Sequence, residues 1–440
     1  SIDKIQVQGP WAGNPRRLTS APENGRYLVE VYDAAANTLI YRKGFDSYFG
    51  EYKTTAPAAR GVVKTVSETF LIPCPKQPVR LEVAVRDRQN RRQAIFKTTI
   101  DPADIFIVRE KPDAAVQVIE QVKNGEPGDK VDLAILAEGY TAAEEGKFRR
   151  DLARFSALLL SQEPYRTFRE RFNICGLFKA SSESGCDEAS FGHFKNTALQ
   201  SGFDAFGSER YLLTEDNRAM RDIAAHVPYD AILIMVNHPR YGGGGIYNLY
   251  CTFTTDNQWN EYLLLHEFGH SFSGLADEYY TSDVAYNEFY PPGVEPLEAN
   301  ITALLDPKNV KWKNLVTKRT ALPTPWEKAA YEKMGETYQQ QRRALNERIA
   351  ERKRSNAPLE EIEALQAKGE EMSRRNGLEV NAFFRKSRYQ GKVGAFEGAG
   401  YASKGLFRPM LDCLMFSRGL RPLCKVCAQA VVDTIKYYSE

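Results

Sequence analysis

The stretch "LLLHEFGHSFSGLADEYY", Leu263–Tyr280, contains two histidines four residues apart, and a glutamate directly follows the first. Residues four apart on an α-helix lie on one face about one turn apart, so His266 and His270 can reach one ion. Glu267 would project beside that ion. The chain has only 5 histidines in 440 residues, so this spacing favours a metal site over two histidines in an ordinary buried helix.

The residues after the second histidine offer a third ligand. A hydrolytic Zn²⁺ site keeps three protein ligands and one water, whereas a structural site is closed by a fourth side chain. Gly274 lets the helix end and the chain turn back, because glycine tolerates left-handed backbone. We expect Asp277 to be the third ligand in preference to Glu278, which would bond a ligand histidine or brace the loop. Glu267 would take a proton from the bound water.

Composition limits the possible partners and the setting of the chain. Its net charge is +2, from 59 basic and 57 acidic residues, which gives no electrostatic case for binding nucleic acid. No apolar run approaches the roughly 18 residues that cross a bilayer, so no transmembrane segment is expected. The opening "SIDKIQVQGP" lacks an initiator Met and a signal-like segment, which favours a processed or trimmed form.

The sequence divides into two regions of different pattern. Residues 1–112 contain short runs rich in β-branched and aromatic residues, "RYLVEVYDA", "NTLIYRKGF", "VRLEVAVRD" and "QAIFKTTID", and they predict an all-β sandwich domain. The segment "REKPDAAVQVIEQVKNGEPGDK" is the expected linker. Residues 113–440 form the second predicted domain, and within it a charged segment at about 325–375 predicts a helical hairpin with a solvated surface or a partner-binding coiled coil.

The second region begins as an α/β unit. The continuous apolar run in "VDLAILAEGY" suits a strand buried on both faces, and "FNICGLFKA" and "DAILIMVN" predict further strands. Thr141 and Glu144 form a capping-box pattern ahead of the helical repeat in "FRRDLARFSALLL".

The motif resembles a known group of enzymes. The pattern of two histidines, Gly274 and a ligand three residues after that glycine is similar to the pattern of the metzincin metallopeptidases. Here three residues separate the second histidine from the glycine, whereas metzincins usually have two. The full string "HEFGHSFSGLADEYY" is closer to the immunoglobulin A peptidase family, a metzincin-like group of bacterial secreted metallopeptidases. The blocks "SSESGCD", "VNHPRYGGGG", "FRPMLDCLM" and "LCKVC" also resemble that family.

The resemblance implies a fold and a site. The expected fold is an α/β (α+β) metzincin-like zinc-peptidase catalytic domain preceded by an all-β sandwich domain. Met415 would lie in a turn beneath the metal, with Met410 as the alternative, because metzincins have a methionine there. No tyrosine closely follows Met415, so a transition-state donor would come from elsewhere. The candidates for that donor are Tyr279, Tyr280 and Arg418.

The segment before the motif helix is expected to bind substrate. In metzincin-like folds the corresponding segment is an edge strand at the rim of the cleft, to which an extended peptide can add. Successive glycines would let a substrate backbone approach closely, the alternative being a floppy turn. Tyr241, Gly242 and Gly243 are the substrate-binding residues expected there.

The 7 cysteines are too few for a disulfide-built scaffold. Cys413, Cys424 and Cys427 lack a fourth cysteine or histidine nearby. We therefore expect buried packing or one disulfide there, in preference to a second metal or a redox site.

These observations favour a zinc endopeptidase acting on protein or peptide substrates, and the resemblance implies an extracytoplasmic protein, whether secreted, periplasmic or on the cell surface. Two alternatives stay open. One is a zinc amidase acting on glycan-linked or cell-wall peptides. The other is a non-catalytic surface-binding protein whose zinc is structural.

Overall fold

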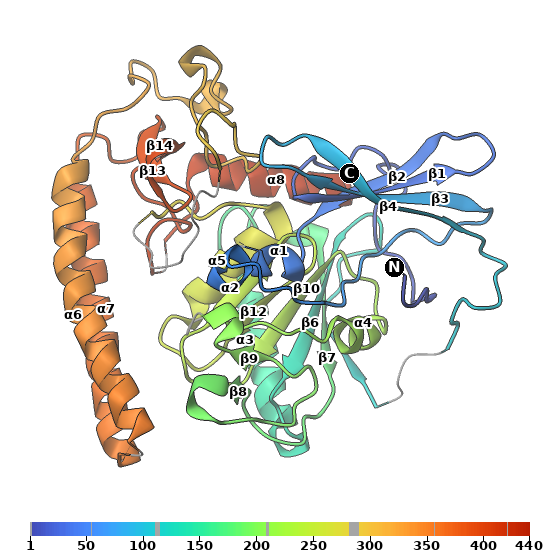
Figure 1. Cartoon of the computed structure of the whole chain (residues 1–440), viewed down its shortest axis with the longest axis horizontal. Coiled ribbons are helices and arrows are strands. Elements are labelled where there is room, and N and C mark those ends of the chain that lie inside the picture. Colours follow the sequence, from blue (N-terminus) through green and yellow to red (C-terminus); the bar gives the residue numbers. More distant parts are fainter. Residues whose placement is uncertain are drawn as a thin grey trace.

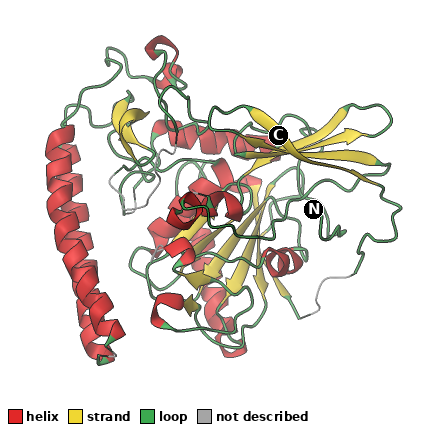
Figure 2. Cartoon of the chain, in the orientation of Figure 1, coloured by secondary structure: helices red, strands yellow, loops and turns green. Residues whose placement is uncertain are grey.

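The computed structural model describes residues 2–53, 55–110, 115–207, 211–280, 290–355, 357–419 and 421–440. Two larger sheets and a long helical hairpin make up the mixed α/β fold (Figures 1 and 2). The predicted domain boundary between residues 112 and 113 lies outside the described residues. Among the described residues, no helix is both long enough and apolar enough to cross a membrane.

The N-terminal region folds around one antiparallel sheet of order β2-β1-β3-β4. Its strands are β1 (Tyr27–Asp33), β2 (Leu39–Phe45), β3 (Val79–Arg86) and β4 (Arg92–Ile100), and they fall on the four predicted segments. Alternate residues such as Val29 and Leu81 are buried on one face, where Trp11 and Phe70 from irregular segments pack. The expected sandwich is not confirmed, since the described residues of this region form a single four-stranded sheet.

The second region is built on a six-stranded sheet of order β11-β12-β10-β6-β7-β5. Its strands are β5 (Gln117–Val122), β6 (Val131–Glu138), β7 (Phe172–Phe178), β10 (Ala231–Val236), β11 (Gly243–Ile246) and β12 (Tyr250–Thr254). The four inner strands are parallel, and β11 and β5 are antiparallel edges. Every residue of β6 is buried, as its apolar run predicts. The predicted linker is wrong over β5, because this half-exposed edge strand lacks the apolar run of an inner strand.

Helices cover both faces of this sheet. One face packs against α3 (Glu145–Ser161), α5 (Asn260–Ser273) and α8 (Lys425–Ser439), and the other packs against α4 (Asn217–Ala224). Ahead of α3, the predicted capping box is present, with the Thr141 backbone N–H donating to Glu144 at 2.9 Å. The histidine motif therefore lies on a helix that packs in the core on this face of the sheet.

The remaining elements surround this core. They are α1 (Tyr48–Tyr52), α2 (Ala56–Ala59), β8 (Asp187–Glu188), β9 (Gly202–Phe203), α6 (Lys328–Arg354), α7 (Leu359–Arg385), β13 (Phe396–Ala399) and β14 (Ala402–Arg408). Helices α6 and α7 pair as an antiparallel hairpin that stands beside the body of the molecule (Figure 1). The predicted hairpin at about 325–375 falls on these helices, and α7 continues to Arg385.

The glycines of β11 are needed for its packing against α5. A Cβ atom at Gly245 would lie 2.4 Å from the Glu267 backbone oxygen and 2.8 Å from the His270 Cβ. One at Gly243 would lie 3.0 Å from the Glu267 Cγ. The glycine run is thus an ordered strand in close contact with the motif helix and not a floppy turn.

Gly245→Ala should therefore force β11 away from α5. We expect the free energy of unfolding to fall by about 1–3 kcal/mol, the usual cost of overpacking a well-packed interface. Urea unfolding followed by tryptophan fluorescence measures this loss. Gly146→Ala is the matched control, because a Cβ there meets only the Arg150 Nη1 at 3.6 Å. Equal stability losses in the two variants would contradict the packing account.

Candidate metal centre

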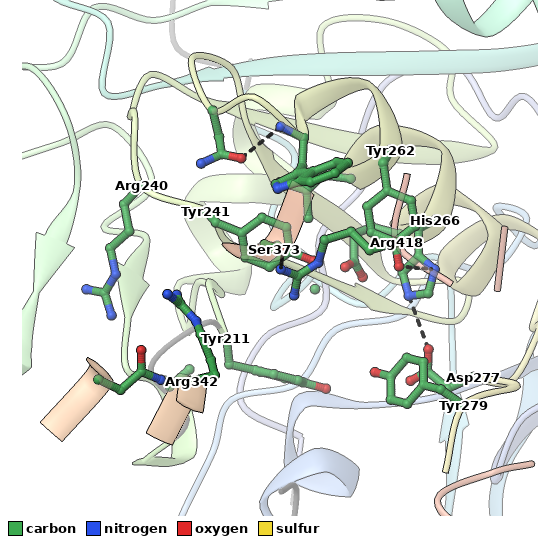
Figure 3. Close-up of a pocket in the computed structure, with 18 of the residues that line it drawn as sticks. Tyr211, Arg240, Tyr241, Tyr262, His266, Asp277, Tyr279, Arg342, Ser373 and Arg418 are labelled. Carbon is green, nitrogen blue, oxygen red and sulfur yellow. Dashed lines mark hydrogen bonds and ion pairs between the residues drawn. The ribbon is translucent and has the colours of Figure 1, made fainter. Parts of the chain in front are cut away.

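Three side chains from the motif helix and the turn after it converge on one point. The Asp277 Oδ1 lies 3.1 Å from the His266 Nε2 and 3.2 Å from the His270 Nε2. The two Nε2 atoms are 3.2 Å apart. Tetrahedral ligands at about 2.0–2.1 Å from one ion are about 3.3 Å apart, so these three donors fit a single metal ion. Figure 3 shows His266 and Asp277 facing each other across this point.

Backbone carbonyls orient both histidines. The Nδ1 of His266 lies 3.2 Å from the Leu414 oxygen, and the Nδ1 of His270 lies 2.6 Å from the Leu275 oxygen. Because a carbonyl oxygen can only accept, the 2.6 Å contact places a proton on the His270 Nδ1. The Leu414 contact favours the same tautomer for His266, whose Nδ1 also lies 3.2 Å from the Tyr262 hydroxyl. In this tautomer each Nε2 lone pair can bind a metal, as coordination through Nε2 requires.

The end of α5 positions the carboxylate. Gly274 has φ 60° and ψ 35°, the left-handed conformation that its place after the helix predicts. The chain turns back through Leu275, and Asp277 reaches the histidines. Burial opposes the charge on His270, but the adjacent Asp277 carboxylate outweighs it and raises the pKa of His270 to about 9. Burial likewise opposes the charge on Asp277, yet His270 and His266 hold its pKa well below the usual range.

Glu278 points away from the two histidines. Its Oε1 lies 3.1 Å from the Asn300 Nδ2 and 3.1 Å from the Cys427 Sγ. Asp277 and Glu278 therefore point into different surroundings, and of these two carboxylates only Asp277 lies beside the histidine pair. Of the two roles expected for Glu278, a bond to a ligand histidine is not made, whereas Asn300 links the Glu278 carboxylate to the backbone of Ala276 and so connects it to the loop. Its side chain also reaches Cys427, which is distant in the sequence.

Glu267 lies at the contact between α5 and β11, next to the histidine pair. It is half-buried, and its carboxyl oxygen would be 3.3 Å from a Cβ at Gly243. Its side chain lines the same cavity as His266, His270 and Asp277. A carboxylate on the cavity wall beside a bound ion is in the right place to exchange protons with water or substrate.

Met415 lies beneath the helix. It is fully buried, and a Cβ at Gly269 would be 3.0 Å from its sulfur. The Glu278 backbone N–H donates to the Met415 oxygen at 2.8 Å. The turn that contains Met415 thus contacts both the helix and the carboxylate segment, whereas Met410 is partly buried against the same core.

The centre opens into a cavity of about 1800 Å³. The predicted substrate-binding residues Tyr241 and Gly243 line it, and the Gly242 oxygen instead accepts from the Thr254 N–H within the sheet. Arg418 lies 4.2 Å from the Tyr241 ring centroid and donates to Ser373 of α7 at 3.0 Å (Figure 3). One face of the α6–α7 hairpin therefore forms a wall of the cavity.

The alternation of an antiparallel pair directs the backbone groups of Gly243 and Gly245 away from β12. The Gly243 oxygen already accepts from the Leu212 N–H at 3.3 Å. Gly245 therefore offers the outward-facing backbone groups nearest to His270.

Sequence reasoning missed Tyr401. This residue follows β13, and its hydroxyl donates to the Asp277 Oδ2, opposite the oxygen that faces the histidines. Tyr279 lies beside it in the cavity wall, whereas Tyr280 packs against Tyr331 and Phe416. No local motif marks Tyr401, since it reaches Asp277 through the return of a distant segment.

Comparison with known proteins found two family models that match the chain. The family model described as IgA Peptidase M64 matches residues 119–435, and the one described as Peptidase M64 N-terminus matches residues 1–97. A search of curated proteins found no match.

Tyr401→Phe should weaken metal binding by about 10- to 100-fold, the usual cost of losing a hydrogen bond that supports a ligand. The dissociation constant can be measured by competition with a chromophoric chelator, using Zn²⁺ as the probe ion. Tyr32→Phe is the matched control, because its hydroxyl donates to Glu30 at 3.2 Å in the N-terminal sheet. Unchanged affinity in Tyr401→Phe would show that this contact does not support Asp277.

Proposed function

Because the chain belongs to the IgA peptidase M64 family of metallopeptidases, we propose that it is a zinc-dependent endopeptidase acting on extracellular proteins. The observation that carries this proposal is the convergence of His266, His270 and Asp277 beside Glu267 in the wall of a large cavity. The extracytoplasmic setting, whether secreted, periplasmic or cell-surface, rests on the family resemblance alone.

The donor set supports Zn²⁺ as the resident ion. Two imidazole nitrogens and one carboxylate oxygen match the ligands of catalytic zinc sites. Among the described residues, the group of possible ligands at this point has three members, which leaves a fourth position for water or substrate. An open position distinguishes a catalytic site from a structural one.

Glu267 would act as general base and then as general acid. A bound zinc ion would polarise the scissile carbonyl and make the attacking water more acidic. Glu267 accepts the proton of that water and later delivers it to the leaving nitrogen. Tyr401 holds Asp277, and the Leu414 and Leu275 carbonyls keep the histidines in the required tautomer. Tyr279 and Arg418 line the cavity and are the candidates for contact with the developing oxyanion.

The edge of the sheet suggests how the substrate binds. An extended peptide can pair with an exposed strand edge through its backbone, whatever its side chains. We propose that substrate lies along β11 and pairs with the outward groups of Gly245. Tyr241 and Arg418 at the rim, and α7 opposite, would then contact its side chains. The hairpin would select for segments that can enter the cavity in an extended form.

Glu267→Gln tests the mechanism. We expect kcat to fall by at least about 10²- to 10⁴-fold, the contribution of a positioned acid–base group, while bound zinc stays at about one ion in this site. A library of unmodified peptides read by mass spectrometry measures cleavage, and elemental analysis measures zinc. Glu261→Gln is the matched control on the exposed first turn of the same helix.

Two results would contradict the endopeptidase proposal. Zinc binding without cleavage of any unmodified peptide, but with cleavage of glycan-linked peptides, would favour the amidase. Equal activity in Glu267→Gln and the wild type would remove Glu267 from the mechanism.

A further inference from the structure

A second group of possible ligands lies away from the histidine pair. Glu278, Cys413, Cys424 and Cys427 place one ligand atom each within 4.8 Å of one another, and all four residues are buried. They come from the segment after α5, the turn before Met415 and the start of α8. None of the four takes part in the reaction proposed above, and all the cysteines are free.

The spacing within this cluster fits one tetrahedral ion. Zinc bound at about 2.3 Å to each sulfur separates two sulfurs by about 3.8 Å, and the Cys413 and Cys427 sulfurs are 3.7 Å apart. With oxygen at about 2.0 Å, a sulfur and an oxygen are about 3.5 Å apart. The Glu278 Oε1 lies 3.1 Å from the Cys427 sulfur and 3.8 Å from the Cys424 sulfur.

Burial raises the pKa of Glu278, Cys413 and Cys427, so their anionic forms need a nearby cation, while backbone N–H groups point at two of the sulfurs. The Cys413 sulfur accepts from the Cys424 N–H at 3.1 Å, and the Cys424 sulfur accepts from the Cys427 N–H at 3.4 Å. Donors of this kind stabilise thiolates, the form that binds metals. Glu278 is fully buried, and its Oε2 has no hydrogen-bond partner among the described residues. The charge of the buried Arg408 acts on this carboxylate, but its guanidinium donates to backbone oxygens of Gly398 and Leu411. Burying a carboxylate in this way is costly unless a cation accompanies it.

We propose that Glu278, Cys413, Cys424 and Cys427 bind a second divalent metal ion, for which Zn²⁺ is the best-matched choice. Four protein ligands close the coordination sphere, so this site is structural and not catalytic. The sequence predicted packing or a single disulfide because only cysteines and histidines were considered as ligands. The fourth ligand is a glutamate brought from 135 residues away along the chain, between Glu278 and Cys413.

This ion would hold the segments that build the histidine centre. Glu278 directly follows Asp277, and Cys413 directly precedes Leu414, whose oxygen orients His266. The ion would also join both segments to the first turn of α8 through Cys424 and Cys427. It would thus fix two ligands of the other site without touching them.

The double variant His266→Ala/His270→Ala isolates the second site. The full chain is purified with reductant, loaded with Zn²⁺ and desalted, and its zinc is counted by elemental analysis. We expect about two ions per chain in the wild type and about one in the double variant. X-ray absorption at the zinc edge should then give zinc–sulfur distances of about 2.3 Å in the double variant, a shell that the histidine centre cannot supply.

Cys424→Ser/Cys427→Ser should lower the wild-type zinc count from about two to about one and remove the sulfur shell. Cys175→Ser, a half-buried cysteine of β7, is the matched control and should keep both ions. If the double cysteine variant does not fold, thiol labelling of the folded wild type replaces it. Cys413, Cys424 and Cys427 should then be labelled only after zinc is removed by a chelator, whereas the labelling of exposed Cys74 should not change.

Three results would overturn the proposal. The first is a His266→Ala/His270→Ala chain that binds no zinc. The second is zinc bound to that variant with only nitrogen and oxygen neighbours. The third is a disulfide within the cluster, found by mass spectrometry in reduced protein. None of these results would affect the peptidase proposal, which depends on cleavage and on Glu267. Loss of cleavage with a preserved sulfur shell would affect only the peptidase proposal.

Discussion

The left-handed turn at Gly274 is the constraint on which the candidate centre depends. It ends α5 one turn after His270, and the Leu275 carbonyl that it turns inward accepts from the His270 Nδ1. The same reversal carries Asp277 to within 3.2 Å of both histidine Nε2 atoms. A side chain at this position would strain the backbone and meet the Tyr247 ring at 3.1 Å. Residues 274–277 therefore set the tautomer of His270 and supply Asp277 as another ligand.

Distant parts of the chain build the rest around that turn. The Met415 turn contacts α5 from below, the return of the chain after β13 brings Tyr401 to Asp277, and the α6–α7 hairpin closes one side of the cavity. The N-terminal region contributes as well: α1 lines the cavity, and the Asp46 N–H donates to the Tyr247 oxygen at 2.9 Å. Segments from both regions of the chain thus line the cavity, and the two family models together match almost all of that chain.

The sequence predicts those features that local pattern determines. Helical spacing brings His266, Glu267 and His270 together, glycine chemistry marks the turn, and continuous apolar runs identify the inner strands. The sequence does not predict features that depend on tertiary contacts. Nothing near Glu278 indicates that its carboxylate faces three cysteines, and a charged hairpin reads as solvated although one of its faces lines the cavity. Strand β5 reads as a linker because an edge strand needs little apolar surface.

An anomalous difference map at the zinc absorption edge, from crystals of the zinc-loaded protein, tests the central claim most directly. The account predicts a peak about 2.0–2.2 Å from the His266 Nε2, the His270 Nε2 and an Asp277 oxygen, with the remaining position facing Glu267 and the cavity. The absence of a peak there, or a peak whose fourth ligand is a protein side chain, would contradict a catalytic metal centre.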